Sequence, residues 1–504
     1  MTEHRRRFWL SAGAALLAGL MLRLWFIVHL SRVAGDSLVY GDIAKNLLLH
    51  RMYAITVWDT APGAINPTLI RLPGYPLFLA ACFRIFGLEH YHAVLYGQLV
   101  ADLITCWLCA ATAARLFSRR AMLPVLWLAT LCPFTANYVA TPLTETLVLT
   151  SIALTFYAFA RWQEANAGGM GEPAAYTRWL WLIAAALAWS ILLRPDEGLL
   201  AAAVLPAMLW RTLAAPKGPH RGSRSRMAVP VLAAALCTLL PLLPWTIRNW
   251  RIFQVFQPLA PRSALDPGDP QFNGFPRWYR TWAIEFDSTE NVYWNYWSDR
   301  IEAGYLPARA YAFGCTARSD TRPSTPSDLR HRTVALLDDY NQRTLAMPAI
   351  DARFDELALE RIQASPLCYY VGLPLARLLN MMLRPRTELT EIPLEWWKWS
   401  EHPAATMLAG AFAALNLAYL TVAVAGFFVW QKRGWLGARE IARAMAASIL
   451  LRCALLLTLD NSEPRYTLEF YPVLLVWAGA LFAQSRPASG VGAASSAGAA
   501  GTAI

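Results

Sequence analysis

Long apolar segments recur along the whole chain, and they constrain its fold more than any other feature. They are separated by polar connections, most of them short. An apolar helix of about 20 residues crosses the hydrocarbon core of a membrane, which is roughly 30 Å thick. We therefore expect an all-α polytopic membrane protein with about ten transmembrane helices. The expected spans are 8–31, 92–115, 121–139, 142–161, 178–193, 197–211, 227–247, 404–430, 443–459 and 465–484.

Charge distribution sets the expected orientation of these spans. The chain is 56% hydrophobic and 16% charged, with a net charge of +11, whereas soluble proteins carry about 25% charged residues. The basic residues cluster in alternate connections, such as Arg5–Arg7, 211–226 and 431–440. This is the positive-inside pattern of membrane proteins, so nucleic acid is not an expected partner. We expect a multi-pass cell (inner) membrane protein with both termini cytoplasmic.

The same pattern divides the chain into parts. The segment 365–386 is apolar enough for a span, but a crossing there would place the basic connection 431–440 on the outer side, so we place the segment in the interface as an amphipathic helix. The expected parts are an N-terminal transmembrane bundle at 1–247 with an interfacial outer loop at 32–91, a large extracytoplasmic loop at 248–403, C-terminal transmembrane helices at 404–484, and a disordered tail at 485–504.

Polar residues gather in six connections on the expected outer side. An arginine or aspartate at bilayer depth costs roughly 2.5 to 3.5 kcal/mol on insertion scales, so such residues usually pair or mark a site. Any one of them alone is an ordinary helix-end anchor. Six together, with acids and bases mixed, favour a cavity for a polar, anionic group at the outer leaflet. The connections are GDSLVYGD (35–42), RLPGYP (71–76), TPLTE (141–145), LLRPDE (192–197), PWTIRNW (244–250) and NSEPRY (461–466).

All of these stretches except TPLTE, in this order, resemble the integral membrane glycosyltransferases of the GT-C superfamily. The resemblance is to the branch with bacterial protein O-mannosyltransferases and the lipid A aminoarabinose transferase, and it runs from about residue 8 to 484. It implies a sugar donor on a polyprenyl phosphate, transfer with inversion, and a lipid, glycan or protein acceptor on the extracytoplasmic face, where the active site would lie. It also implies a reacting aspartate at the position of Asp36.

One departure from the family pattern comes directly after Asp36. Many relatives carry two adjacent acids there, but this chain has Ser37. Asp42 comes six residues later, on a different side of the helix, and we expect it to be solvated. No metal ligand set is identified, and a divalent metal is left open.

The chemistry of transfer assigns expected roles to the outer residues. A desolvated carboxylate with a raised pKa is a suitable base for the acceptor's proton, which suits Asp36; its alternative role is to cap a helix. The leaving phosphate needs positive charge, which arginine supplies. The expected phosphate-binding residues are Arg465 with Tyr466, then Arg71, Arg194 and Arg248. Arg248 has a second interpretation as a snorkelling anchor.

Three further residues are expected to line the substrate cavity. Glu145 would orient a sugar hydroxyl, or it is a helix-start acid favoured by the dipole. Tyr75 lines the cavity or is an interfacial aromatic, and Tyr40 is a neighbour of Asp36. Asp102, inside a span, is expected either to pair with Arg23 or Arg452 or to have a functional role.

Two other functional classes compete with transfer. A transporter or lipid flippase would carry polar residues near the midplane and a repeated half, neither of which is prominent. A scaffold would not require so many converging acids and arginines. The cysteines lie mostly in apolar segments as small hydrophobes, and Cys315 and Cys368 form a pair if their compartment is oxidising.

Overall fold

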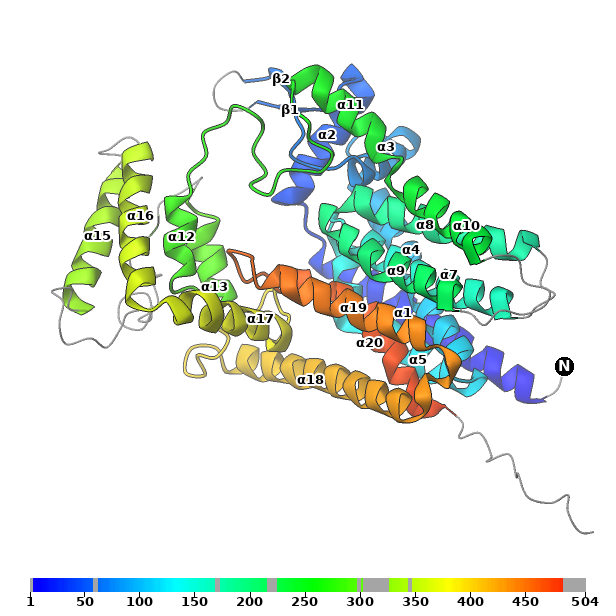
Figure 1. Cartoon of the computed structure of the whole chain (residues 1–504). Coiled ribbons are helices and arrows are strands. Elements are labelled where there is room, and N and C mark those ends of the chain that lie inside the picture. Colours follow the sequence, from blue (N-terminus) through cyan, green and yellow to red (C-terminus); the bar gives the residue numbers. More distant parts are fainter. Residues whose placement is uncertain are drawn as a thin grey trace, which may run out of the picture.

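The computed structural model describes residues 3–57, 62–167, 173–214, 224–296, 301, 326–342 and 347–483. Helices make up most of this part of the chain. They form an elongated bundle, with a smaller group of helices at the end opposite the N-terminus (Figure 1). The expected mainly helical architecture is therefore confirmed.

A helix or a pair of helices coincides with each expected span. These elements are α1 (Glu3–Leu30), α4 (Tyr91–Leu116), α5 (Arg119–Thr130) with α6 (Pro133–Ala136) and η1 (Asn137–Ala140), α7 (Glu145–Ala167), α8 (Pro173–Leu193), α9 (Gly198–Ala214), α10 (Arg224–Leu239) with α11 (Leu242–Phe253), α18 (Pro403–Lys432), α19 (Arg439–Leu456), and η7 (Pro464–Phe470) with α20 (Tyr471–Ala478) and η8 (Gly479–Phe482). A short η2 (Pro195–Glu197) precedes α9.

Length and apolarity identify fewer of these helices as membrane spans. In the described part of the chain, five are long and apolar enough to cross a membrane, namely Arg5–Leu30, Tyr91–Leu116, Pro195–Ala214, Ala228–Phe253 and Pro403–Lys432. The pair Arg119–Thr130 and Pro133–Ala140 makes a sixth if its 50° bend is allowed. The chain is thus a polytopic membrane protein, and the count of ten spans stays a prediction.

The first outer loop folds into two helices and a hairpin. It contains α2 (Asp36–His50), β1 (Ala54–Thr56), β2 (Ile65–Pro67) and α3 (Gly74–Phe86). β1 and β2 pair antiparallel, with Ile55 opposite Asn66. Helices were expected here, but this two-stranded sheet was not. α2 buries Ile43 and Ala44.

Asp42 ties α2 to this hairpin. Its carboxylate accepts hydrogen bonds from the backbone N–H of Thr56 at 2.6 Å and from the Thr56 hydroxyl at 2.8 Å. Asn46, one turn further along the helix, also donates to it. The expectation that Asp42 is simply solvated is wrong, because the carboxylate accepts hydrogen bonds from Thr56, the last residue of β1.

Two glycines set the positions of nearby polar residues. Gly35 has φ of +54°, in the left-handed region that favours glycine, and α2 begins immediately afterwards at Asp36. Gly74 lies against the end of α8, where a Cβ would come within 2.6 Å of the Leu192 carbonyl group. Only glycine at position 74 therefore lets the RLPGYP turn, which carries Arg71, pack this closely against the end of α8.

The large loop contains a helical unit with its own apolar core. Its elements are α12 (Gly274–Arg280), α13 (Phe286–Ser288), η3 (Thr289–Tyr293), α15 (Pro326–Gln342), α16 (Met347–Ala364), η5 (Cys368–Gly372) and α17 (Leu373–Leu383). Phe275, Trp278 and Phe354 are fully buried in that core. Trp278 and Trp282 pack in the same core. The division into domains stays a prediction.

The segment 365–386 contains η5 and α17. At 11 residues, α17 is shorter than the roughly 20 residues that a span needs. It buries Leu378 and Met381 and leaves Leu375 and Leu379 exposed, so it is apolar on two sides. Its interfacial position stays a prediction. Cys315 lies outside the described residues.

A buried ion pair joins three helices of the bundle. Arg23 on α1 and Asp102 on α4 approach to 2.6 Å, and their side chains are 0% and 1% exposed. Arg23 also donates to the backbone carbonyls of Gly19 and of Thr130 at the end of α5. Of the partners proposed for Asp102, Arg23 is therefore the one found.

Gly74→Ala should destabilise the fold and displace the turn that carries Arg71. Because the new Cβ would meet backbone atoms that have little room to move, we expect a loss of about 1 to 3 kcal/mol in the free energy of unfolding in detergent. Gly13→Ala, in α1, is the matched control, since nothing lies within 4 Å of its Cβ position. Equal stability of the two variants would contradict the close approach at Gly74.

Candidate active site

Asp36 lies between two arginines from distant parts of the chain. Arg71, in the turn before α3, donates to Asp36 Oδ1 at 2.7 Å. Arg465, in η7, donates to Asp36 Oδ2 at 3.0 Å. The side chains of Asp36, Arg71 and Arg465 are 28%, 23% and 17% exposed, so the group is reachable from solvent but largely enclosed. One carboxylate thus joins the first outer loop to the last expected span.

A second layer of charges lies deeper than Asp36. Arg465 forms an ion pair with Glu463 and lies 3.8 Å from Glu145, at the start of α7. Glu145 also pairs with Arg194 at 3.3 Å. The side chain of Glu145 is only 2% exposed, against 28% for Asp36. Side-chain exposure therefore falls from Asp36 to Glu145.

Aromatic rings lie against the arginines. The ring of Tyr466 lies 5.5 Å from the Arg465 guanidinium carbon and 5.4 Å from that of Arg194. Tyr40 lies 5.8 Å from Arg71 in the same way. Tyr75 is fully buried, packs edge-on against Tyr40, and donates to the Gln98 side chain at 2.6 Å. Tyr40 and Tyr466 thus border the site, while Tyr75 supports it from behind.

The structure brings together eight of the nine residues expected at the site. Asp36, Arg71, Glu145, Arg194, Arg465 and Tyr466 are linked through direct contacts, and Tyr40 and Tyr75 are connected to them through Arg71. Arg248 is placed elsewhere. It donates to the backbone carbonyls of Tyr53 and Thr68, both at 2.7 Å, and makes no ion pair with this group in the described part of the chain.

Sequence reasoning missed three charged residues beside the site. Glu463 was part of the quoted NSEPRY motif but was not singled out. Glu469, one turn further along η7, pairs with Arg194 at 3.3 Å and with Arg452. Arg452 also binds Asp196 at 2.7 Å. Arg452 and Glu469 could have been found as charged side chains inside expected spans, which need partners, and Glu463 as a member of a polar motif.

Three carboxylates below the site are close enough together to hold a metal ion. Ligand atoms of Asp196, Glu197 and Glu469 all lie within 4.8 Å of one another. Arg452 contacts all three, and Arg194 contacts Asp196 and Glu469. Guanidinium groups therefore already neutralise these carboxylates, which does not fit a resident divalent cation. Near Asp36, the adjacent residue is Ser37 and not a second acid.

The charges around Asp36 decide its protonation. Burial raises the pKa of Asp36, but the neighbouring guanidiniums of Arg465 and Arg71 outweigh burial and lower the pKa to about 2. The expectation of a raised pKa at Asp36 is therefore wrong for the free protein. Glu463 behaves in the opposite way. Its burial, reinforced by Asp36 and Glu145, outweighs Arg465 and raises the pKa of Glu463 to about 7.

Several buried polar atoms at the site have unused hydrogen-bonding capacity. The Ser37 hydroxyl, Arg71 Nε and Glu463 Oε2 are enclosed and have no hydrogen-bond partner. Buried polar groups are usually hydrogen-bonded, so unsatisfied ones call for an explanation such as a bound molecule. The site therefore combines guanidinium groups that can bind an anion, carboxylates that can accept a proton, and polar atoms that have no hydrogen-bond partner. It suits the transfer of a group that departs as an anion.

Asp36→Asn should change how stability depends on pH. Because the folded-state pKa is lowered, the carboxylate stabilises the fold above its unfolded pKa near 4, and this stabilisation is lost as the pH falls toward 2. At pH 7 we expect the free energy of unfolding of the wild type to be larger than that of Asp36→Asn. Between pH 7 and pH 2 this difference between the two proteins should shrink by about 2 kcal/mol.

The control for this measurement is Glu3→Gln, which removes a pair with Arg7 whose side chains are 74% and 75% exposed. Exposed pairs contribute about 0 to 1 kcal/mol, so this variant should lose little at either pH. A difference between wild type and Asp36→Asn that is constant with pH would contradict the ion pairs at Asp36.

The sequence and the fold were compared with known proteins. Residues 67–245 match the family of dolichyl-phosphate-mannose-protein mannosyltransferases. No curated protein matches the chain in sequence. Similar solved structures include the oligosaccharyltransferase AglB of Archaeoglobus fulgidus, in complex with an inhibitory peptide and a dolichol-phosphate, at 12% identity and a TM-score of 0.48. That match covers 94% of this chain and 50% of the archaeal chain, so this chain spans about half the archaeal length.

ArnT of Cupriavidus metallidurans in the apo state is also similar, at 15% identity and a TM-score of 0.38, covering 95% of this chain and 78% of that one. The same protein bound to undecaprenyl phosphate gives 14% and 0.35, covering 94% and 77%. Within this chain, the family match includes Arg71, Glu145 and Arg194. Residues 67–245 thus relate this part of the chain to the dolichyl-phosphate-mannose-protein mannosyltransferases, and the resemblance is confirmed over this range, which includes the RLPGYP and LLRPDE motifs.

Proposed function

We propose that this chain is a membrane glycosyltransferase that moves a sugar from a polyprenyl-phosphate donor to an acceptor on the extracytoplasmic side, with inversion. The observation that carries the proposal is the Asp36 carboxylate held between Arg71 and Arg465 in a partly enclosed site. The name of the family matched by residues 67–245 supports a lipid phosphate as the carrier of the sugar.

The donor phosphate would take the place that the Asp36 carboxylate has on the two arginines. Guanidinium binds phosphate and carboxylate oxygens with the same planar donors, so an incoming phosphate competes directly with Asp36. Once displaced, Asp36 loses two cationic partners and gains an anionic neighbour. Both changes raise the pKa of a carboxylate. Donor binding would therefore convert a poor base, with a pKa of about 2, into a competent one.

The transfer step then needs only the donor, the acceptor and side chains of this site. An acceptor hydroxyl oxygen attacks the anomeric carbon on the face opposite the phosphate, and the bond from that carbon to the phosphate oxygen breaks. Asp36 takes the hydroxyl proton. The lipid phosphate leaves with its negative charge held by Arg71 and Arg465, which stabilises the charge that develops in the transition state. A divalent metal has no step in this scheme.

Other residues would position the substrates. Arg194 and Glu145 lie deeper than Asp36, and Glu145 is the carboxylate available to a sugar hydroxyl on that side. Tyr40 and Tyr466 provide rings beside the arginines. The acceptor's identity, the sugar and the cytoplasmic position of both termini remain proposals at this level.

The alternative of a transporter or flippase is supported by ion pairs inside expected spans, such as that of Arg23 with Asp102. The side chains of Arg23 and Asp102 are almost fully buried, and Arg23 also donates hydrogen bonds to the backbone carbonyls of Gly19 and Thr130. A closed, satisfied pair of this kind is more typical of a structural link than of a transport pathway. The converging charges at Asp36 favour transfer.

Asp36→Asn should leave the protein inserted in the membrane and reduce sugar transfer by about 10²- to 10⁴-fold, the usual contribution of a general base. The measurement is single-turnover transfer from a polyprenyl-phosphate sugar by the purified protein in nanodiscs. Glu89→Gln is the matched control, because it removes an exposed ion pair with Lys45 in the same outer loop. Near wild-type turnover in Asp36→Asn would remove the catalytic role.

Glu463→Gln distinguishes the two acids next to Arg465. Above pH 7 the Glu463 carboxylate is charged and competes with the donor phosphate for Arg465, so the KM of the wild type for donor should rise with pH through about 7. Glu463→Gln should abolish that rise and keep the transfer activity. A loss of activity as large as that of Asp36→Asn would instead identify Glu463 as the base.

A further inference from the structure

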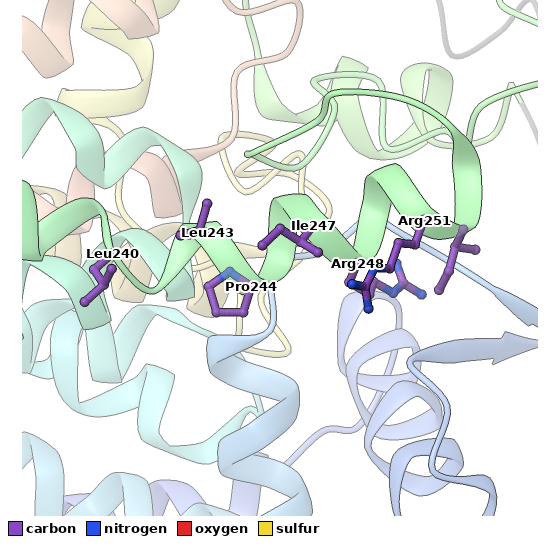
Figure 2. Close-up of a pocket in the computed structure, with 7 residues that line it drawn as sticks. Leu240, Leu243, Pro244, Ile247, Arg248 and Arg251 are labelled. Carbon is purple, nitrogen blue, oxygen red and sulfur yellow. The ribbon is translucent and has the colours of Figure 1, made fainter.

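A hollow on the surface of α11 is not explained by the site around Asp36. It has a volume of about 510 Å³ and extends from the end of α10 along the length of α11 (Figure 2). Apolar side chains form most of it, and Arg248 and Arg251 lie together at its outer end (Figure 2). We call it the α11 groove; its lining is Leu240, Leu243, Pro244, Ile247, Arg248, Arg251 and Ile252.

The two arginines of the groove differ in their bonding. Arg248 is anchored, because it donates to the backbone of Tyr53 and Thr68 and lies against the ring of Trp245 at 5.2 Å. Arg251 is exposed, and its guanidinium has no hydrogen bond or ion pair with any residue that the structure describes. Neither arginine pairs with a carboxylate in the described ranges. The Asp266 carboxylate interacts electrostatically with Arg248, so the free positive charge next to the apolar part of the groove is that of Arg251.

The groove is linked to the candidate active site through one residue. Arg248 donates to the Tyr53 carbonyl, and the Tyr53 hydroxyl donates to the Arg71 carbonyl at 3.0 Å. Arg71 in turn binds Asp36. A phosphate at Arg251 would therefore lie at the outer end of the groove, next to the hairpin and the turn that deliver Arg71.

We propose that the α11 groove is a surface site for the lipid phosphate, occupied before the phosphate passes to Arg71 and Arg465. The prenyl chain would lie along Leu243 and Ile247, and the phosphate would bind Arg251. The groove runs along a single helix, which suits one hydrocarbon chain better than the paired chains of a phospholipid. The passage of the lipid phosphate from the groove to Arg71 and Arg465 rests on the proposed function. Binding of the lipid phosphate in the groove can be measured independently of that function.

The test uses the full chain in nanodiscs and a polyprenyl phosphate that carries a photoactivatable diazirine in its first prenyl units. Crosslinks should map to 240–252. Unlabelled polyprenyl phosphate should compete, whereas polyprenol without phosphate and phosphatidylglycerol should compete weakly. Arg251→Ala removes the free charge, and Leu243→Trp fills the hollow.

We expect Arg251→Ala to reduce crosslinking to 240–252 by about five-fold, the effect of one arginine near an anionic group. Leu243→Trp should reduce it to a similar extent, because the indole fills the space of the prenyl chain. The apparent KM for donor should rise by a similar factor. Two matched controls should behave as wild type. Arg439→Ala removes an exposed arginine at the start of α19, and Leu417→Trp enlarges an exposed apolar residue on α18.

If α18 is labelled as strongly as α11, and Arg251→Ala does not change the labelling, the crosslinks report ordinary lipid contact. That result would contradict the proposed binding site in the α11 groove. If crosslinking depends on Arg251 but the protein transfers no sugar, the lipid-phosphate site in the groove is supported and the proposed function is refuted. Transfer with a KM unchanged in both variants would retain the function and refute the groove.

Discussion

The ion pairs of Asp36 are the constraint on which the candidate site depends. They join α2, the RLPGYP turn and η7, which are separated by up to 429 positions along the chain. A carboxylate and two guanidiniums at the edge of a low-dielectric bundle attract each other more strongly than in water, and each would be costly to leave unpaired. The protein stabilises an anion at the place where, in the proposed mechanism, the donor phosphate binds.

A second charge cluster supports this arrangement from below. Arg452 contacts Asp196, Glu197 and Glu469, and thereby joins α19, the η2 turn and η7. Because Glu469 lies one turn from Arg465, the cluster fixes the segment that presents Arg465 to Asp36. Fixed positive charge is what a departing phosphate requires, since donors that are already oriented need no reorganisation during the reaction.

The sequence allowed prediction of the helices better than of the contacts between them. Apolar length located most of the helices, and the gathering of acids and arginines in a few connections correctly indicated that Asp36, Arg71 and Arg465 meet. The pattern could not reveal that Arg248 turns toward the hairpin backbone, or that Asp42 holds Thr56, because both depend on irregular loop geometry. The lowered pKa of Asp36 results from its two arginine partners, and partner number is not encoded in spacing.

The most direct test of this account is a structure of the chain in lipid with a bound polyprenyl phosphate. The account predicts phosphate oxygens within hydrogen-bond distance of Arg71 and Arg465, with the Asp36 carboxylate displaced from both and turned toward the acceptor side. A phosphate bound elsewhere, with the pairs from Asp36 to Arg71 and Arg465 intact at 2.7 and 3.0 Å, would contradict it.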